Sequence, residues 1–130
     1  MLERLSPLGV EETVRLIRDA VTETGVTVFA TIDHAAGARS VGVDMPESTV
    51  LVVGNPAAGA PPMLDAPNLA LDLPTRVLVR QASPGAVGSS VVLSDPRALA
   101  RRHGLRDEQV EALGQIVSVI DRALEQVSTR

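Results

Sequence analysis

The amino-acid sequence predicts one α+β domain over residues 1–130, with a sheet of four or five strands and the first and last helices on one face. Three observations support this prediction. Apolar residues recur with a helical period near both ends of the chain, short apolar runs fill its middle, and Pro84-Gly85 joins two of those runs as a hairpin turn. A chain of 130 residues with 45% hydrophobic residues is long enough for one core and short for two domains.

Two segments have the helical spacing. Between Gly9 and Gly25, apolar residues lie three or four positions apart: Val10, Val14, Ile17 and Val21. After Asp107, the predicted N-cap of the last helix, the same spacing continues for almost three heptads: Val110, Leu113, Val117, Ile120, Leu124 and Val127. We predict that both apolar faces pack on the sheet.

Five short runs have the character of strands. Residues 2–5 form a predicted edge strand, residues 26–32 alternate in polarity, and residues 49–53 are continuously apolar; the hairpin strands are residues 75–81 and 86–93. Short helices are predicted over residues 34–39 and after Asp95-Pro96. Residues 54–68 are rich in proline and glycine, and we expect them to be mainly irregular.

The composition excludes several kinds of chemistry. There is no cysteine, so thiolate catalysis and zinc–thiolate sites are absent, and there is no lysine for Schiff-base chemistry or a phosphate-binding loop. A net charge of −4 and a single aromatic residue, Phe29, argue against nucleic-acid binding. No run is long and apolar enough for a membrane span, so we expect no membrane contact and a cytoplasmic protein.

Polar residues gather where two predicted strands end. Asp33-His34 follow the first of these strands, and Gly54-Asn55-Pro56 follow the second. Because the 15 residues between Asp33 and Thr49 allow a crossover, we predict parallel or non-adjacent strands whose polar ends share one rim. Asp33, His34, Gly54, Asn55 and Pro56 are therefore the predicted ligand-binding residues.

Each of these residues also has a structural interpretation. Asp33 could cap the short helix that follows it, and Asn55 could bond backbone groups of a tight turn. His103 is expected to complement the end of its helix. No histidine and carboxylate residues have the short spacing of a metal site, so we predict neither a metal nor another cofactor.

Four separated motifs resemble a bacterial family known as domain of unknown function 302. They are Ile32-Asp33-His34 with Ala38 and Gly42, then Gly54-Asn55-Pro56, Leu71-Asp72-Leu73-Pro74, and Asp95-Pro96 with His103-Gly104-Leu105. The resemblance covers nearly the whole chain and implies an antiparallel-rich sheet with helices on one face, in the TATA-box-binding-protein-like class. It also implies a homodimer and brings no activity. The chain departs from the family at Val53, Arg80 and Leu93, where aromatic residues are usual.

The leading functional hypothesis is a homodimeric module that binds a small ligand or a protein partner. Ile116, Val119 and Ala123 exceed what one helix face needs, and we predict that the dimer buries them. The alternative is a small hydrolase or isomerase that uses His34 as a base, oriented by Asp33 or Asp72. A pocket containing His34 would favour the enzyme, whereas an apolar pocket without converging titratable groups would favour the binding module.

Overall fold

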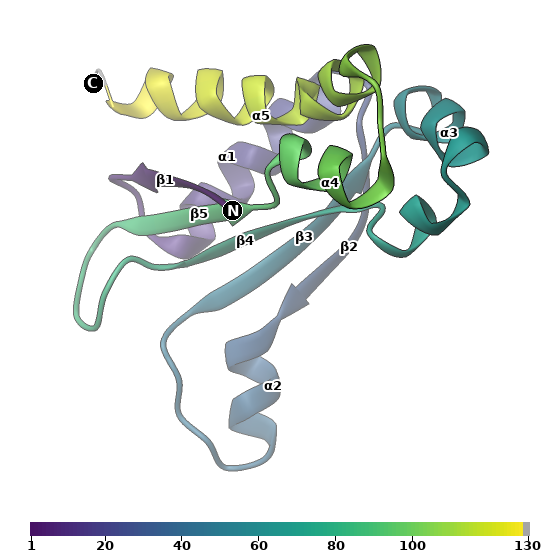
Figure 1. Cartoon of the computed structure of the whole chain (residues 1–130). Coiled ribbons are helices and arrows are strands. Elements are labelled where there is room, and N and C mark those ends of the chain that lie inside the picture. The colour runs from purple at the N-terminus through teal and green to yellow at the C-terminus, as the bar shows by residue number, and fades with distance from the viewer. Residues whose placement is uncertain (129–130) are drawn as a thin grey trace.

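The structure is a computed structural model that describes residues 1–128. Five strands, five α-helices and one 3₁₀-helix follow one another along this part of the chain (Figure 1). In order they are β1 (Leu2–Ser6), α1 (Val10–Glu23), β2 (Thr27–Asp33), α2 (His34–Ser40), β3 (Ser48–Gly54), α3 (Pro56–Asp65), the 3₁₀-helix η1 (Pro67–Leu71), β4 (Thr75–Gln81), β5 (Ser89–Leu93), α4 (Pro96–His103) and α5 (Asp107–Ser128).

The strands form one antiparallel sheet in the order β1-β5-β4-β3-β2. The two long helices, α1 and α5, lie on the same face of it and contact each other, as Figure 1 shows. The predicted α+β class, the five strands and the β4–β5 hairpin are therefore confirmed. In the hairpin, the Ala86 amide donates to the Ser83 carbonyl, and Gly85 supplies the positive φ of 77° that the turn needs.

The core lies between the sheet and these two helices. Its buried residues come from alternate positions of β3, β4 and β5 and from one stripe of each helix: Leu51, Val53, Val77, Val79, Val91, Leu93, Ile17, Val21, Ile120 and Leu124. Helix α5 contacts α1, β1, α3 and α4, so it buries a wider stripe than the heptad spacing indicated. Ile116, Val119 and Ala123 are buried within the single chain, and the prediction that a dimer must bury them is wrong.

Strands β2 and β3 are adjacent and antiparallel, which corrects the predicted crossover. Thr27 pairs with Gly54, and Asp33 pairs with Thr49. The long connection contains α2 and a loop over residues 41–47, so it joins neighbouring strands without crossing the sheet. The C-terminal ends of β2 and β3 consequently lie at opposite edges of the sheet, where an edge is a row of strand ends and not an outer strand.

A bulge changes the side-chain directions in β2. The register shifts between Val28, opposite Val53, and Ala30, opposite Val52. Val28 therefore faces the core, whereas Ala30 faces the other side, and the simple alternation predicted for this strand stops at Phe29. The bulge leaves Phe29 without a paired residue, and half of its side chain is exposed.

Residues 56–65 are helical, although their prolines and glycines predicted mainly irregular structure. Asn55 caps α3 by accepting a hydrogen bond of 3.0 Å from the Ala57 amide, and Pro56 takes the first helical position, where a proline needs no amide hydrogen. Pro61 and Pro62 lie inside the helix. The capping signal at Asn55-Pro56 therefore prevails over the two internal prolines.

Candidate functional site: an apolar pocket

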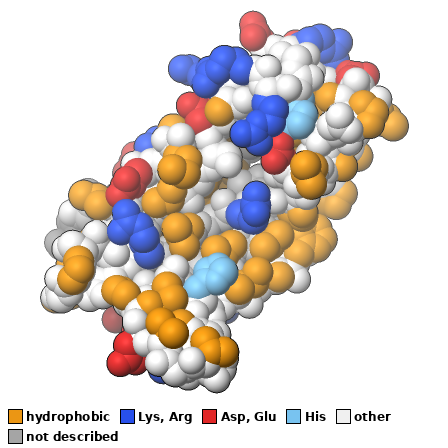
Figure 2. Space-filling view, turned by 60° about the horizontal axis from the view of Figure 1, so that its bottom comes forward, with side chains coloured by type: hydrophobic (Ala, Val, Ile, Leu, Met, Phe, Trp, Pro, Cys, Tyr) orange, Lys and Arg blue, Asp and Glu red, His pale blue; other side chains and the backbone are white. Residues whose placement is uncertain are grey.

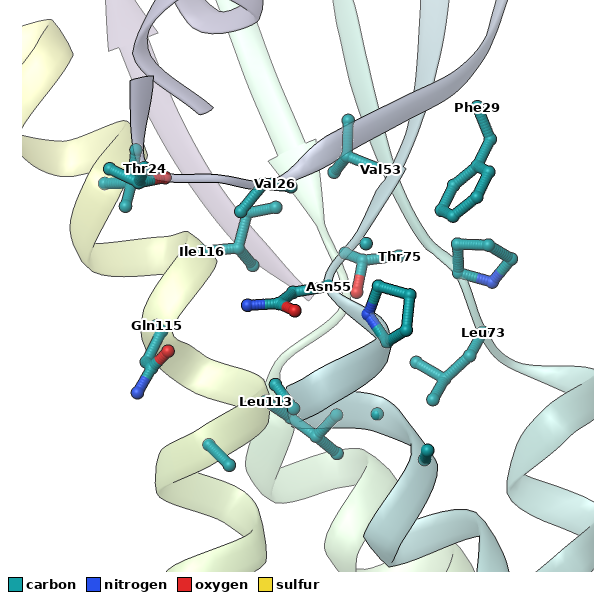
Figure 3. Close-up of a pocket in the computed structure, with 18 of the residues that line it drawn as sticks. Thr24, Val26, Phe29, Val53, Asn55, Leu73, Thr75, Leu113, Gln115 and Ile116 are labelled. Carbon is teal, nitrogen blue, oxygen red and sulfur yellow. The ribbon is translucent and has the colours of Figure 1, made fainter. Parts of the chain in front are cut away.

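A pocket of about 440 Å³ opens between the C-terminal end of β3, helix α3 and one face of α5. Figure 3 shows Val26, Val53, Leu113 and Ile116 around it, with Leu73 on the far side. Its volume lies within the range of small-molecule sites. The pocket is thus large enough for a ligand of several joined carbon groups.

Three of the predicted ligand-binding residues line this pocket: Gly54, Asn55 and Pro56. A Cβ atom at Gly54 would lie 3.3 Å from both Phe29 Cε2 and Pro74 Cβ, so glycine lets these two rings approach the strand end. Asn55 uses its carbonyl oxygen to cap α3, which directs its amide group toward α5 in Figure 3. These residues shape the pocket through backbone geometry and through the Asn55 amide group, which has no hydrogen-bond partner within residues 1–128.

The pocket wall formed by α5 was not recognised in the sequence. Ala112, Gln115, Ser118 and Arg122 are spaced by three, three and four residues and line the same cavity. The signal was present beside the apolar seam, as a stripe of small and polar residues. It could not be assigned to a pocket without knowing that α3 lies opposite.

Within the described part of the chain, Arg122 is the one charged residue that lines the pocket. No aspartate, glutamate or histidine of residues 1–128 does so. The remaining polar groups are hydroxyls and amides, including Thr24, Thr75 and Gln115. The pocket is therefore mainly apolar, with one cationic position at the α5 side.

Asp33 and His34 lie at the opposite edge of the sheet from Asn55, so the predicted shared rim is wrong. The antiparallel pairing places Asp33 beside Thr49, whereas Thr27 pairs with Gly54. Both Asp33 and His34 are exposed. Asp33 caps α2 by accepting a hydrogen bond of 2.9 Å from the Ala36 amide, as its structural interpretation predicted.

Asp72 pairs with His103 instead of His34. The His103 Nε2 atom lies 2.6 Å from Asp72 Oδ2, and Arg102 Nη1 lies 3.2 Å from both carboxylate oxygens. The His103 hydrogen bond is the largest cause that lowers the pKa of Asp72; burial opposes it, and Arg102 lowers it further. The proposed pairing of His34 with Asp72 is wrong, because Asp72 lies near the start of β4, at the Gly54 edge of the sheet.

The contacts of Asp72 with His103 and Arg102 hold α4 against the segment that forms part of the pocket wall. Asp72 directly precedes Leu73 and Pro74, which line the pocket, and His103 ends α4. A separate hollow of about 20 Å³ beside Asp72, Thr75 and Arg76 is too small for more than a water molecule. Within residues 1–128, no three histidine or carboxylate residues are grouped to hold a metal ion.

The fold and the pocket define a small α+β domain with an open, mainly apolar cavity. The chain matches the family described as Domain of unknown function DUF302 over residues 2–123, and it belongs to that family. The crystal structure of an uncharacterized conserved DUF302 protein from Bacillus stearothermophilus has the same fold, with a TM-score of 0.79 and 16% identity over 97% of this chain and 96% of that one. The resemblance seen in the sequence motifs is confirmed.

Longer relatives contain a similar segment. The chain is 36% identical over 97 residues to proteins named fluoride-specific ion channel FluC 1 from Brucella suis and Brucella abortus. The match covers 75% of this chain and 37% or 35% of those relatives, so the chain spans little more than a third of their length. Within residues 1–128, no helix has the length and apolar character needed to cross a membrane.

Proposed function

We propose that this domain is a binding module that takes a small, largely apolar ligand in the pocket between α3 and α5. The observation that carries the proposal is the lining of the cavity: apolar side chains with few polar groups and, among the described residues, no carboxylate or imidazole. Burial of an apolar ligand surface contributes about 25 cal/mol per Å², which gives such a cavity a source of affinity.

The alternative of a hydrolase or isomerase has less support. General acid–base catalysis needs a titratable group within hydrogen-bond reach of the substrate. His34 and Asp33 are at the other edge of the sheet, and the Asp72–His103 pair is absent from the residues that line the large pocket. The similar segment in longer Brucella proteins also fits a module that works beside other parts of a chain.

Replacement of Ala58 by phenylalanine tests the proposal, because it fills the pocket from the α3 side. A solvatochromic dye that fluoresces in apolar sites should bind the wild-type domain, and the absence of tryptophan and tyrosine leaves little background. We expect the Ala58→Phe variant to bind the dye at least tenfold more weakly. Ala70→Phe adds the same side chain at an exposed position of η1 and should bind like wild type.

Equal dye affinity of the wild type and the Ala58→Phe variant, with both folded, would contradict binding in this pocket. His34→Ala provides a second control, because His34 lies away from the cavity. If His34→Ala lost dye binding, the binding site would include Asp33 and His34, as the sequence predicted, and would not be the pocket between α3 and α5.

We also propose that the domain is a homodimer in the cytoplasm that associates through the uncovered face of its sheet. Half-buried or exposed apolar residues point to this face: Ala30, Ile32, Val50, Val52, Leu78 and Val92. Figure 2, in which the lower side of Figure 1 comes forward, shows groups of hydrophobic side chains on that side of the molecule, with basic side chains and a histidine between them. The register also places Glu3, Arg76 and Arg80 on this face, with Arg80 at 3.4 Å from Glu3. A second copy of the chain carries the same face and is the occupant that we propose.

The area of this face supports a dimer when the α2 region is included. Five strands about 4.8 Å apart, with about 3.4 Å per residue, span roughly 24 by 20 Å, or roughly 500 Å². A standard interface buries about 800 Å² per partner. The loop after α2 carries further exposed apolar residues, Val41, Val43 and Met45, and we propose that they extend the interface toward that size.

Sedimentation at micromolar concentration tests the dimer. The expected mass is twice the chain mass of 13.6 kDa. Ile32→Glu should give a folded monomer. Ile32 is already 44% exposed in the single chain, so the variant should fold, whereas in the dimer the new glutamate would place a charge in the interface. Val87→Glu, at an exposed position of the β4–β5 loop, should remain dimeric, and a monomeric wild type would refute the association.

A further inference from the structure

The charge of the pocket identifies the class of ligand more closely. On the basis of the proposed binding function, we propose that the ligand is an apolar carboxylate whose anionic head pairs with Arg122 and whose tail lies along α5 toward Leu73. The tail is the part that the apolar lining selects, and the head is the part that Arg122 selects.

The distribution of charge supports an anionic head. The chain has 16 acidic residues and a net charge of −4, yet the described lining contains no carboxylate and one cation. An anion is therefore repelled by the protein as a whole and attracted at this one position of the cavity. A cationic ligand would meet Arg122 without any opposing acidic group in the lining.

Arg122 is available for such a ligand. It forms no ion pair within residues 1–128, and its side chain is exposed at the pocket. The adjacent carboxylate, Asp121, is engaged by Arg4 at 2.8 Å on the β1 side of the helix. A guanidinium can donate two parallel hydrogen bonds to a carboxylate, which favours this head group over an alcohol.

The shape of the site fits an elongated molecule. The lining on α5 extends from Ala112 to Arg122, about 15 Å at a rise of about 1.5 Å per residue. Figure 3 shows Leu113 and Ile116 on this wall, with the Asn55 amide directed toward it from the strand end. The Asn55 Nδ2 group has no hydrogen-bond acceptor within the described residues, so it can act as a second donor to a polar group of the ligand.

Three probes with the same ten-carbon chain and different heads test the inference: decanoate, decanol and decylammonium. Each is titrated at pH 7 and low salt against the dye-loaded domain, and displacement gives its affinity. We expect decanoate to bind about tenfold more tightly than decanol, with decylammonium weakest. Arg122→Gln should bring decanoate to the affinity of decanol and leave decanol unchanged, whereas Arg122→Lys should retain much of the preference.

The control is Arg15→Gln, which removes an exposed arginine of α1 outside the pocket and should preserve the preference for decanoate. Equal affinities of decanoate and decanol for the wild type would overturn the inference that the ligand has a carboxylate head. The proposed binding of an apolar ligand in the pocket would still stand. If no probe displaces the dye and Ala58→Phe does not weaken it, both this inference and the proposed function fail.

Discussion

Truncation of Leu69 to alanine should lower the free energy of unfolding by about 3–5 kcal/mol, as for fully buried leucines whose cavity does not collapse. Leu69 is 0% exposed in η1, although it lies outside the main core cluster between the sheet and the long helices. It fixes η1, which contacts both α3 and α4. Urea denaturation at pH 7 measures the change.

Leu71 is the matched control for this experiment. It lies two residues further along the same 3₁₀-helix, and its side chain is 87% exposed. Leu71→Ala should change the free energy of unfolding by less than about 0.5 kcal/mol. If the two truncations cost the same, η1 does not have the packing described, and the wall that α3 supplies to the pocket loses its support.

Most of the fold could be predicted from local patterns. The spacing of Val14, Ile17 and Val21 located α1, and the Pro84-Gly85 turn located the β4–β5 hairpin. The failures concern which elements pack against each other, whether they are neighbours in the sequence, as β2 and β3 are, or far apart, as α3 and α5 are. Strand pairing of β2 with β3 depends on where α2 packs, and the composition of residues 34–47 does not specify that position.

The candidate site could be predicted only in part for the same reason. Gly54-Asn55-Pro56 could be predicted as site residues because glycine, asparagine and proline together are typical of a turn at a strand end, and all three line the pocket. Arg122 could not be predicted as a site residue, since a single arginine on a helix usually belongs to the solvated face. Its place in the pocket depends on the packing of α3 against α5. That packing could not be predicted, because Pro61 and Pro62 indicated irregular structure where α3 forms.

The residues at the two edges of the sheet therefore have different roles from those their chemistry suggested. Asp33 and His34 have the residue types of a catalytic pair, but Asp33 is used to cap α2. Asp72, which the sequence linked with His34, instead joins η1 and β4 to α4 through His103 and Arg102. The position of this pair, next to the pocket wall, makes its removal informative about both stability and binding.

Replacement of Asp72 by asparagine should destabilise the domain by about 1.5–3 kcal/mol at pH 7, the range for hydrogen bonds to charged groups. The His103 side chain is 8% exposed, so its bond to the carboxylate is shielded from water, whereas Arg102 is mostly exposed and adds less. Asp44→Asn, at an exposed position in the loop after α2, is the control and should have little effect.

The destabilisation should depend on pH, because the His103 hydrogen bond holds the pKa of Asp72 below its usual value of about 3.9 in the folded state. A carboxyl group with a lowered folded pKa adds stability above its unfolded pKa, and that contribution is lost as the pH falls through the folded pKa. The free energies of unfolding of wild type and Asp72→Asn, measured by urea denaturation, should therefore differ fully at pH 6–7 and converge as the pH falls below the usual carboxyl pKa and through the lowered pKa of folded Asp72. A difference that stays constant over this range would show that Asp72 stabilises the fold without its charge.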